Sequence, residues 1–176
     1  MRKVPVNMRL RQVVHDDHMF LIDLHNDPDV LMNLTNPQPI TIRHHMRWWY
    51  STIADERQLR LVFTVDDQKV GFTKFYNIDR VNSNCVLGAD IHKDYRGKGY
   101  AKHMWNLMLN HCFNILGLHR VSLTTAEYNH IAYHLYLKLG FREEGKLTQS
   151  LCRNGKFYNQ YVFFMLKEDW DVAVLS

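Results

Sequence analysis

The sequence has few cysteines, no long apolar run and no recognisable export signal. Its three cysteines, Cys85, Cys112 and Cys152, are odd in number and widely spaced, which argues against a disulfide framework and against a Cys-x-x-Cys zinc site. We expect each to be a small buried apolar side chain. No stretch reaches the roughly 20 apolar residues that a membrane helix needs, and the N-terminus lacks an apolar signal core. These absences predict a soluble, cytoplasmic protein with no membrane partner.

The sequence also lacks any block of five or more basic residues. Its net charge is +4, and it contains no recognisable helix-turn-helix or RNA-binding motif. We therefore expect no nucleic-acid partner, although a mildly basic chain favours anionic ligands over cationic ones. Neither an internal repeat nor a low-complexity linker divides the chain, so residues 1–176 are predicted to form a single domain.

The spacing of apolar residues predicts alternating strands and helices. Helical spacing predicts helices at 16–25, 42–53 and 101–116, and Asn129 is expected to cap a fourth helix. Gly117 is expected to end the third helix and Gly140 the fourth. The Pro/Asn-rich stretch 26–30 is predicted to be a loop. Strands are predicted at 9–14, 59–65, 69–78, 84–91, 119–125 and 157–166. This order indicates a mixed α/β sheet with helices on its faces.

A glycine turn, YRGKGYA at 95–101, joins the strand 84–91 to the helix that follows it. The free N–H groups and positive dipole of a helix start bind anions, and glycines let a phosphate approach the backbone. The segment lacks the Walker A pattern, and Lys102 stands where a dinucleotide fingerprint needs its third glycine. It does match a third phosphate-binding pattern, [Arg/Gln]-x-x-Gly-x-[Gly/Ala], through Arg96, Gly99 and Ala101.

A second motif lies downstream of the glycine turn. The stretch NHIAYHLYLKLGF, at 129–141, resembles the Asn-x-x-Ala-x-x-x-Tyr-x-x-x-Gly-Phe signature of the GNAT superfamily of N-acetyltransferases, with matches at Asn129, Ala132, Tyr136, Gly140 and Phe141. The two motifs occur in the order found in that family. The resemblance implies a single-domain, mostly antiparallel central sheet flanked by helices, in which two splayed parallel strands hold the coenzyme.

The resemblance also implies acetyl-coenzyme A as co-substrate. The backbone amides of residues 97–102 would hold its pyrophosphate, and the strand 87–92 would pair with its pantetheine arm. His130 and His134 have metal-pair spacing, but no third ligand accompanies them, so we expect no metal. The residues expected to bind the coenzyme are Ile91, His92, Lys93, Arg96, Gly97, Lys98, Gly99, Tyr100, Ala101, Lys102 and Asn129.

Amide formation from a thioester needs a neutral amine and a proton for the departing thiolate. The resemblance implies that Tyr136 is the general acid. Its position on an apolar helix face, taken alone, predicts instead that it is a core aromatic side chain. Some protein N-terminal acetyltransferases carry a glutamate twelve residues earlier, where this sequence has Thr124. Asp90 and Glu127 are the candidate bases, acting directly or through water, and His92 is an alternative proton relay.

The acceptor is predicted from weaker signals. Segment 26–49 loosely resembles acetyltransferases of nucleotide-linked amino sugars, and five basic residues in or just after it would meet acceptor phosphates: Arg43, His44, Arg47, Arg57 and Arg60. The alternatives are a polyamine acetyltransferase, for which Asp27, Asp29, Asp55 and Glu56 are available, and a protein N-terminal (ribosomal-protein-type) acetyltransferase. A non-catalytic module that only binds acetyl-coenzyme A is a further alternative.

The C-terminal stretch KEDWDVAVLS, at 167–176, has no motif of its own. It is predicted either to cover the sheet or to pair with a second subunit. A homodimer is therefore an open alternative at the level of the sequence.

Overall fold

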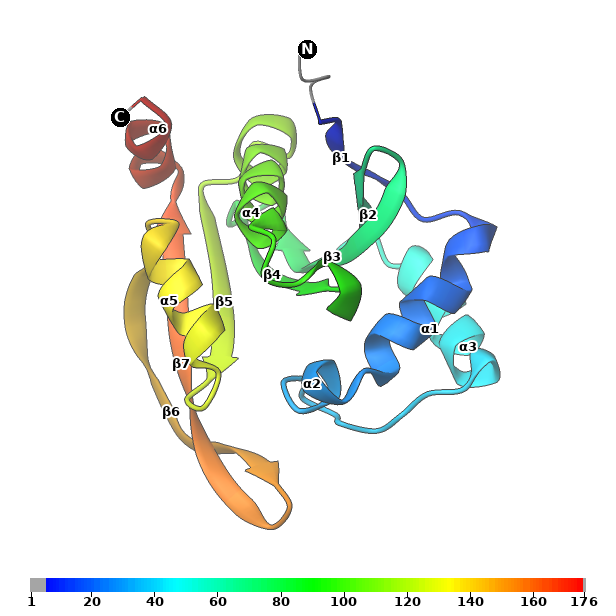
Figure 1. Ribbon diagram of the computed structural model, residues 1–176. Helices are drawn as coiled ribbons and strands as arrows, with labels where there is room; N and C mark the ends of the chain where they lie inside the picture. Colours follow the sequence, from blue (N-terminus) through cyan, green and yellow to red (C-terminus); the bar gives the residue numbers. More distant parts are fainter. Residues whose placement is uncertain (1–5, 176) are drawn as a thin grey trace.

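The computed structural model describes residues 6–175, which form one seven-stranded sheet covered by helices (Figure 1). The strand order is β1–β2–β3–β4–β5–β7–β6, and every neighbouring pair is antiparallel except β4 and β5. This confirms the predicted mixed, mostly antiparallel sheet. The strands are β1 (Met8–Gln12), β2 (Leu59–Val65), β3 (Gln68–Asp79), β4 (Asn84–Ile91), β5 (Arg120–Ala126), β6 (Arg142–Arg153) and β7 (Lys156–Leu166).

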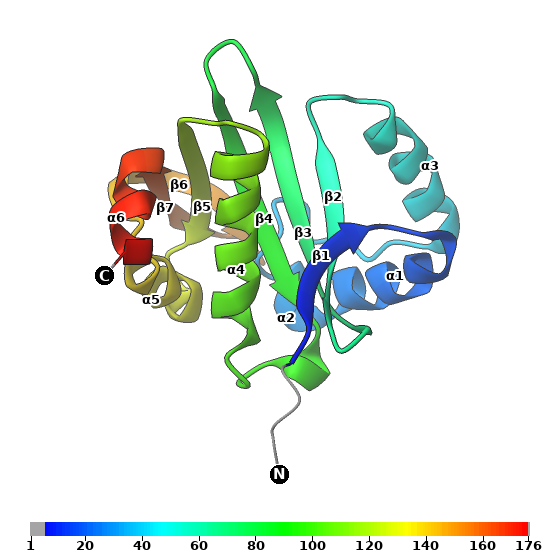
Figure 2. The ribbon, with the colours of Figure 1, turned by 90° about the horizontal axis from the view of Figure 1, so that it is seen from above.

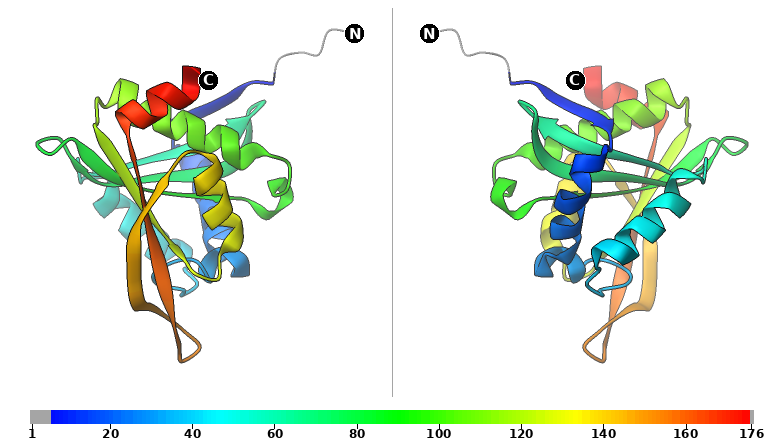
Figure 3. Two further views of the ribbon diagram at one scale, coloured as in Figure 1. Left: turned by 90° about the vertical axis from the view of Figure 1, so that its left-hand side faces the viewer. Right: turned by 90° about the vertical axis from the view of Figure 1, so that its right-hand side faces the viewer.

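The helices divide between the two faces of the sheet (Figures 2 and 3). On one face lie α4 (Tyr100–Asn110), which continues as a π-helical turn η3 (His111–Ile115), and α5 (His130–Lys138). On the other lie α1 (His18–Asn26), α2 (Pro28–Leu31) and α3 (Ile42–Ile53). Two short 3₁₀ turns, η1 (His15–Asp17) and η2 (Lys93–Tyr95), and the C-terminal α6 (Lys167–Leu175) complete the fold.

Strand alternation decides which side chains meet which helices. In β3, Phe75 faces the large core beneath α4, whereas Phe72 packs against α1 and α2. Because successive side chains point to opposite faces, Lys74 shares the face of Phe72. Phe72 lies opposite Asp90 of β4, so Asp90 is on that face as well. The α1–α2 side of the sheet therefore carries charged side chains, while the α4 side is apolar.

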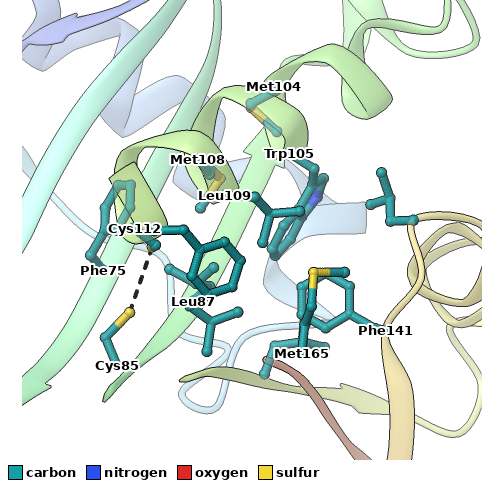
Figure 4. Close-up of a cluster of buried hydrophobic side chains, with 14 of the residues drawn as sticks. Phe75, Cys85, Leu87, Met104, Trp105, Met108, Leu109, Cys112, Phe141 and Met165 are labelled. Carbon is teal, nitrogen blue, oxygen red and sulfur yellow. Dashed lines mark hydrogen bonds between the residues drawn. The ribbon is translucent and has the colours of Figure 1, made fainter. Parts of the chain in front are cut away.

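The large core fills the space between α4, α5 and the sheet (Figure 4). Trp105, Met108 and Leu109 of α4 are fully or almost fully buried in it. The Sγ atoms of Cys85 and Cys112 lie 3.8 Å apart within this core as free thiols. Their predicted role as small buried side chains is confirmed.

Several local predictions were wrong or incomplete. Cys152 is exposed rather than buried, because it lies on the edge strand β6. That strand was missed altogether, since almost all of its side chains are exposed and it shows no apolar alternation. The predicted loop 26–30 contains the one-turn helix α2, which the Asp27 side chain caps and Pro28 opens.

Other local predictions were confirmed. Gly117 and Gly140 have φ angles of 67° and 91° where the two helices end. The C-terminal stretch forms α6, whose Trp170 is buried with its ring 5.6 Å from that of Phe113, so it covers the core as one alternative predicted. Within residues 6–175, no helix is both long and apolar enough to cross a membrane.

Candidate active site

The parallel strands β4 and β5 separate after a short paired stretch. They pair only at Asn84–Arg120, Cys85–Val121 and Val86–Ser122. Beyond this point β4 stays paired with β3 as far as Ile91, while β5 stays paired with β7. The two strands therefore diverge, as Figure 1 shows, and one edge of β4 is left without a strand partner in the described chain. An extended ligand can pair with such an edge as an additional strand would.

The glycine turn lies at the end of this edge and opens α4. Gly97 and Gly99 have φ angles of 73° and 81°, and a Cβ built on either would meet nothing within 4 Å. Gly99 is the N-cap of α4, and no side chain bonds to the helix start there. The first amides of α4 are thus available, the space above them is open, and the turn fits a pyrophosphate.

Arg96 is engaged in contacts within the chain. Its Nε donates to the carbonyl of Ile91 at 3.0 Å, and its guanidinium pairs with Asp27 at 3.1 Å and Asp29 at 2.9 Å. Burial works against the carboxylate of Asp27, but the hydrogen bond and charge of Arg96 outweigh it, so the pKa of Asp27 is lowered. Arg96 therefore fastens the turn to α2, and its predicted contact with the coenzyme stays a prediction.

His92 closes β4 and faces α1. Its Nε2 lies 2.9 Å from the carboxylate of Asp23, and its ring stacks on Phe20 with centroids 5.6 Å apart. Its Nδ1 accepts a long hydrogen bond from the backbone of Asp94, so it also caps η2. The side chain thus links the end of β4 to α1. Its predicted contact with the coenzyme stays a prediction.

Tyr136 is a core aromatic side chain, as its position on the helix predicted. Its ring is buried, edge-on to Trp105 at 5.1 Å and to Phe141 at 5.8 Å, as a core aromatic would be. Burial, followed by the charge of the Asp90 carboxylate, raises the pKa of its hydroxyl well above the ordinary value. The hydroxyl therefore keeps its proton at neutral pH and lies close enough to β4 to sense the charge of Asp90, and its role as general acid stays a prediction.

Asp90 forms an ion pair with Lys74. Their side chains are 18% and 12% exposed, so the pair is largely withdrawn from water but not sealed. Lys74 was not among the predicted site residues. The available signal was the second lysine of the strand sequence KVGFTKFYNI, which lies among apolar residues and which strand alternation places on the face opposite Phe75.

Glu127 and Asn129 both form hydrogen bonds with other parts of the chain. The carboxylate of Glu127 accepts bonds from the backbone and the side chain of Asn159, at 2.9 and 2.7 Å, which lower its pKa. Asn129 caps α5 by accepting from the amide of Ala132, and its Nδ2 donates to Asn33 at 2.9 Å. The geometry favours Asp90 over Glu127 as the base, and the coenzyme contact of Asn129 stays a prediction.

The remaining predicted coenzyme residues, Ile91, Lys93, Lys98, Tyr100, Ala101 and Lys102, all lie at or between the end of β4 and the first turn of α4. The Nζ of Lys98 lies 5.3 Å from the centre of the Tyr95 ring. Within the part of the chain that the structure describes, no three His, Cys, Asp or Glu side chains are grouped so as to hold a metal ion.

Comparisons with known proteins agree with this geometry. Residues 7–142 match the family model described as an acetyltransferase (GNAT) domain. The chain is 27% identical to the uncharacterized N-acetyltransferase YokL of Bacillus subtilis, over 94% of this chain and 93% of YokL. It is 28% identical to the spermidine N(1)-acetyltransferase of Escherichia coli K12, over 87% and 82% of the two chains.

A solved structure extends the likeness to three dimensions. The spermidine N-acetyltransferase of Vibrio cholerae, in complex with CoA and spermine, superposes with a TM-score of 0.88 at 25% identity, over 93% of this chain and 97% of that one. The diverging strands, the open glycine turn and the buried tyrosine are the features that the sequence resemblance to this family implied. The chain belongs to the GNAT acetyltransferase family, and it is an N-acetyltransferase that uses acetyl-coenzyme A as its co-substrate.

Proposed function

We propose that the acceptor is a polyamine, acetylated on a primary amine. The observation that carries this proposal is the breadth of the likeness to spermidine acetyltransferases, which spans more than four fifths of both chains in sequence and nearly all of both in structure. The polyamine was an alternative at the level of the sequence, where a nucleotide-linked amino sugar was preferred. The relatives described above lend the amino sugar no support.

The charge of the α1–α2 side supports a cationic acceptor. Residues 18–41 contain three aspartates and no lysine or arginine. The carboxylates of Asp23 and Asp29 are 60% and 85% exposed, although each also contacts a cation or a histidine of the chain. This stretch covers the sheet face opposite α4, on the side from which an acceptor would reach the diverging strands (Figure 3). Exposed carboxylates here would attract the ammonium groups of a polyamine.

The basic residues expected to meet acceptor phosphates do not form one cluster. Arg60 is buried over the ring of Tyr76 and donates to the carbonyl of Phe75 at 2.7 Å. Arg57 is paired with Asp55. The others lie on exposed positions of α3. Two of the five basic residues are thus engaged within the chain, which weakens the argument for a phosphate-bearing acceptor.

The catalytic step needs one proton removed from nitrogen and one supplied to sulfur. The amine nitrogen bonds to the carbonyl carbon of the acetyl group while the bond from that carbon to sulfur breaks. Tyr136 gives its hydroxyl proton to the departing sulfur, and Asp90 takes a proton from the nitrogen, directly or through a water. The proton then passes from Asp90 back to the tyrosine oxygen through solvent. The backbone N–H groups at the edge of β4 stabilise the oxyanion.

An acceptor panel tests the proposal. The chain is incubated with acetyl-coenzyme A and, in turn, spermidine, spermine, a nucleotide-linked amino sugar and an N-terminal peptide, and thiol release and acetylated product are both measured. We expect spermidine or spermine to give the highest kcat/KM. A clearly better amino sugar or peptide would overturn the polyamine acceptor while leaving the acetyltransferase assignment intact.

Variants that neutralise single aspartates test whether these carboxylates bind the acceptor. Asp23→Asn and Asp29→Asn should raise KM for spermidine more than kcat changes, because they remove carboxylates that attract the ammonium groups. Asp171→Asn is the matched control, since its carboxylate lies on α6, away from α1 and α2 (Figure 1). Equal KM values in all three variants would show that these aspartates do not recognise the acceptor.

A further inference from the structure

The pairing of β3 with β4 brings the side chain of Lys74 to Asp90. It lies opposite Gly88 in the antiparallel ladder of β3 and β4. A Cβ at Gly88 would sit 3.9 Å from both Cβ and Cε of Lys74, so the lysine stem lies directly over the missing side chain. Asp90 is two residues further along β4 and therefore points to the same face. The stem crosses Gly88 and delivers the ammonium to the Asp90 carboxylate.

The surroundings of the pair keep the ammonium of Lys74 charged. Burial disfavours the ammonium of Lys74, but the charge of Asp90, together with Tyr76, outweighs burial and the opposing charge of Arg60, so the pKa of Lys74 is raised. The groups that face the pair are Arg60 from β2, Tyr76 from β3 and Tyr136 from α5. Asp90 is the carboxylate among them, and Lys74 is the cation in direct contact with it.

We infer that Lys74 is a positioning residue for acetyl transfer, which holds the Asp90 carboxylate charged and aimed at the opening between β4 and β5. This rests on the role of Asp90 given above. Lys74 need not touch either substrate. It acts through Asp90, because a neighbouring ammonium stabilises the charged form of a carboxylate and fixes its orientation by a charge-assisted hydrogen bond. Asp90 is then ready to accept the proton from the amine nitrogen.

The experiment compares the pH dependence of Lys74→Met with that of the unaltered enzyme. Without the ammonium, no cation in direct contact offsets the desolvation of this largely buried carboxylate, so its charged form becomes less favourable. We expect kcat/KM to fall on the order of 10- to 100-fold at neutral pH, because displacing a catalytic group from its productive position lowers the rate by about that factor. The loss should be larger at lower pH. The ratio of the two kcat/KM values at each pH cancels the ionisation of the acceptor amine, which both enzymes share.

Three further variants separate positioning from general damage to the fold. Lys74→Arg should restore most of the rate and the original pH profile, since it keeps a cation on Asp90. Lys69→Met is the matched control, because Lys69 is on the same strand and pairs with Asp17 instead. Lys74→Met combined with Asp90→Asn should be no slower than Asp90→Asn alone, because the two side chains act as one unit.

Two outcomes would overturn the inference. One is a Lys74→Met enzyme that keeps the original rate and pH profile while Asp90→Asn is impaired, which would leave the role of Asp90 standing. The other is a rate ratio that does not vary with pH, with no rescue by Lys74→Arg. If Asp90→Asn itself retained full activity, the role proposed for Asp90 would fail, and this inference with it.

Discussion

The rings of Trp105 and Tyr136 meet edge to face, with centroids 5.1 Å apart and planes at 77°. This contact joins α4, which opens with the glycine turn, to α5, which carries the tyrosine hydroxyl. Core packing therefore sets the position of α4, whose first amides we propose bind the coenzyme, relative to Tyr136, which we propose is the general acid. A substitution at either ring is therefore expected to change the position of α4 relative to α5.

Tyr136→Phe keeps this packing and removes only the hydroxyl. We expect kcat to fall by roughly 10²-fold or more, because general acid catalysis contributes on that scale. The affinity for acetyl-coenzyme A, measured by calorimetry, and the thermal midpoint should change little. Wild-type turnover at saturating substrates would mean that Tyr136 is only a core aromatic.

Gly99→Val tests the glycine turn. A β-branched residue at a φ of 81° is strained by about 1–2 kcal/mol, and its side chain would enter the space above the helix start. We expect calorimetry to show acetyl-coenzyme A binding weaker by roughly tenfold or more, since about 1.4 kcal/mol of lost interaction gives that factor.

Gly117→Val is the matched control for that change. Gly117 has a φ of 67° and equally open surroundings, but it follows η3, far from the site. It should lose stability without losing coenzyme affinity. If both variants bound the coenzyme as tightly as the unaltered chain, the turn would not be its binding site.

Asp90 and Glu127 should respond differently to neutralisation. Asp90→Asn removes the carboxylate whose charge acts on Tyr136 and which we propose is the base, so it should lower kcat by roughly 10²-fold. Glu127→Gln should mainly lower the thermal midpoint, because an amide cannot accept both bonds from Asn159. A larger kinetic loss in Glu127→Gln than in Asp90→Asn would reverse the assignment of the base.

A buried histidine pair predicts how stability depends on pH. The Nδ1 of His18 lies 2.9 Å from the Nε2 of His45, which joins α1 to α3. Burial, then the charges of His18 and His25, lower the pKa of His45 to about 4. The unfolded chain, with ordinary histidines near pH 6.5, binds a proton first. The free energy of unfolding should therefore fall as the pH drops from about 6.5 to about 4.

His45→Gln is the variant that isolates this effect. Glutamine can still hydrogen-bond to His18 but carries no charge, so urea unfolding at pH 7 and pH 5 should differ less than in the unaltered chain. His134→Gln, an exposed position on α5, serves as the control. An undiminished pH dependence in His45→Gln would show that other groups are responsible.

Local motifs explain why part of the site could be predicted from the sequence. Gly99 and Tyr136 lie in short patterns whose geometry is set by neighbouring residues, so their elements and caps followed from spacing alone. The two motifs also identified the family. The diverging strands β4 and β5 were expected from that resemblance rather than from the pattern of apolar residues.

Contacts between distant segments explain what was missed. Lys74 meets Asp90 because of the register between β3 and β4, which no local pattern specifies. Arg96 meets Asp27 and Asp29 across more than 60 residues, so its charge alone suggested a phosphate ligand. The edge strand β6 has buried side chains only at its end, Leu151 and Arg153, and one of these is charged, so it could not be recognised from apolar alternation.

The most direct test of the account is the product formed from spermidine. The chain and its Tyr136→Phe variant are each incubated with acetyl-coenzyme A and spermidine, and the products are analysed by mass spectrometry beside a thiol assay. The account predicts singly acetylated spermidine and free coenzyme A in equal amounts, formed roughly 10²-fold more slowly by the variant. Thiol release without acetylated spermidine, or equal rates in the two proteins, would contradict it.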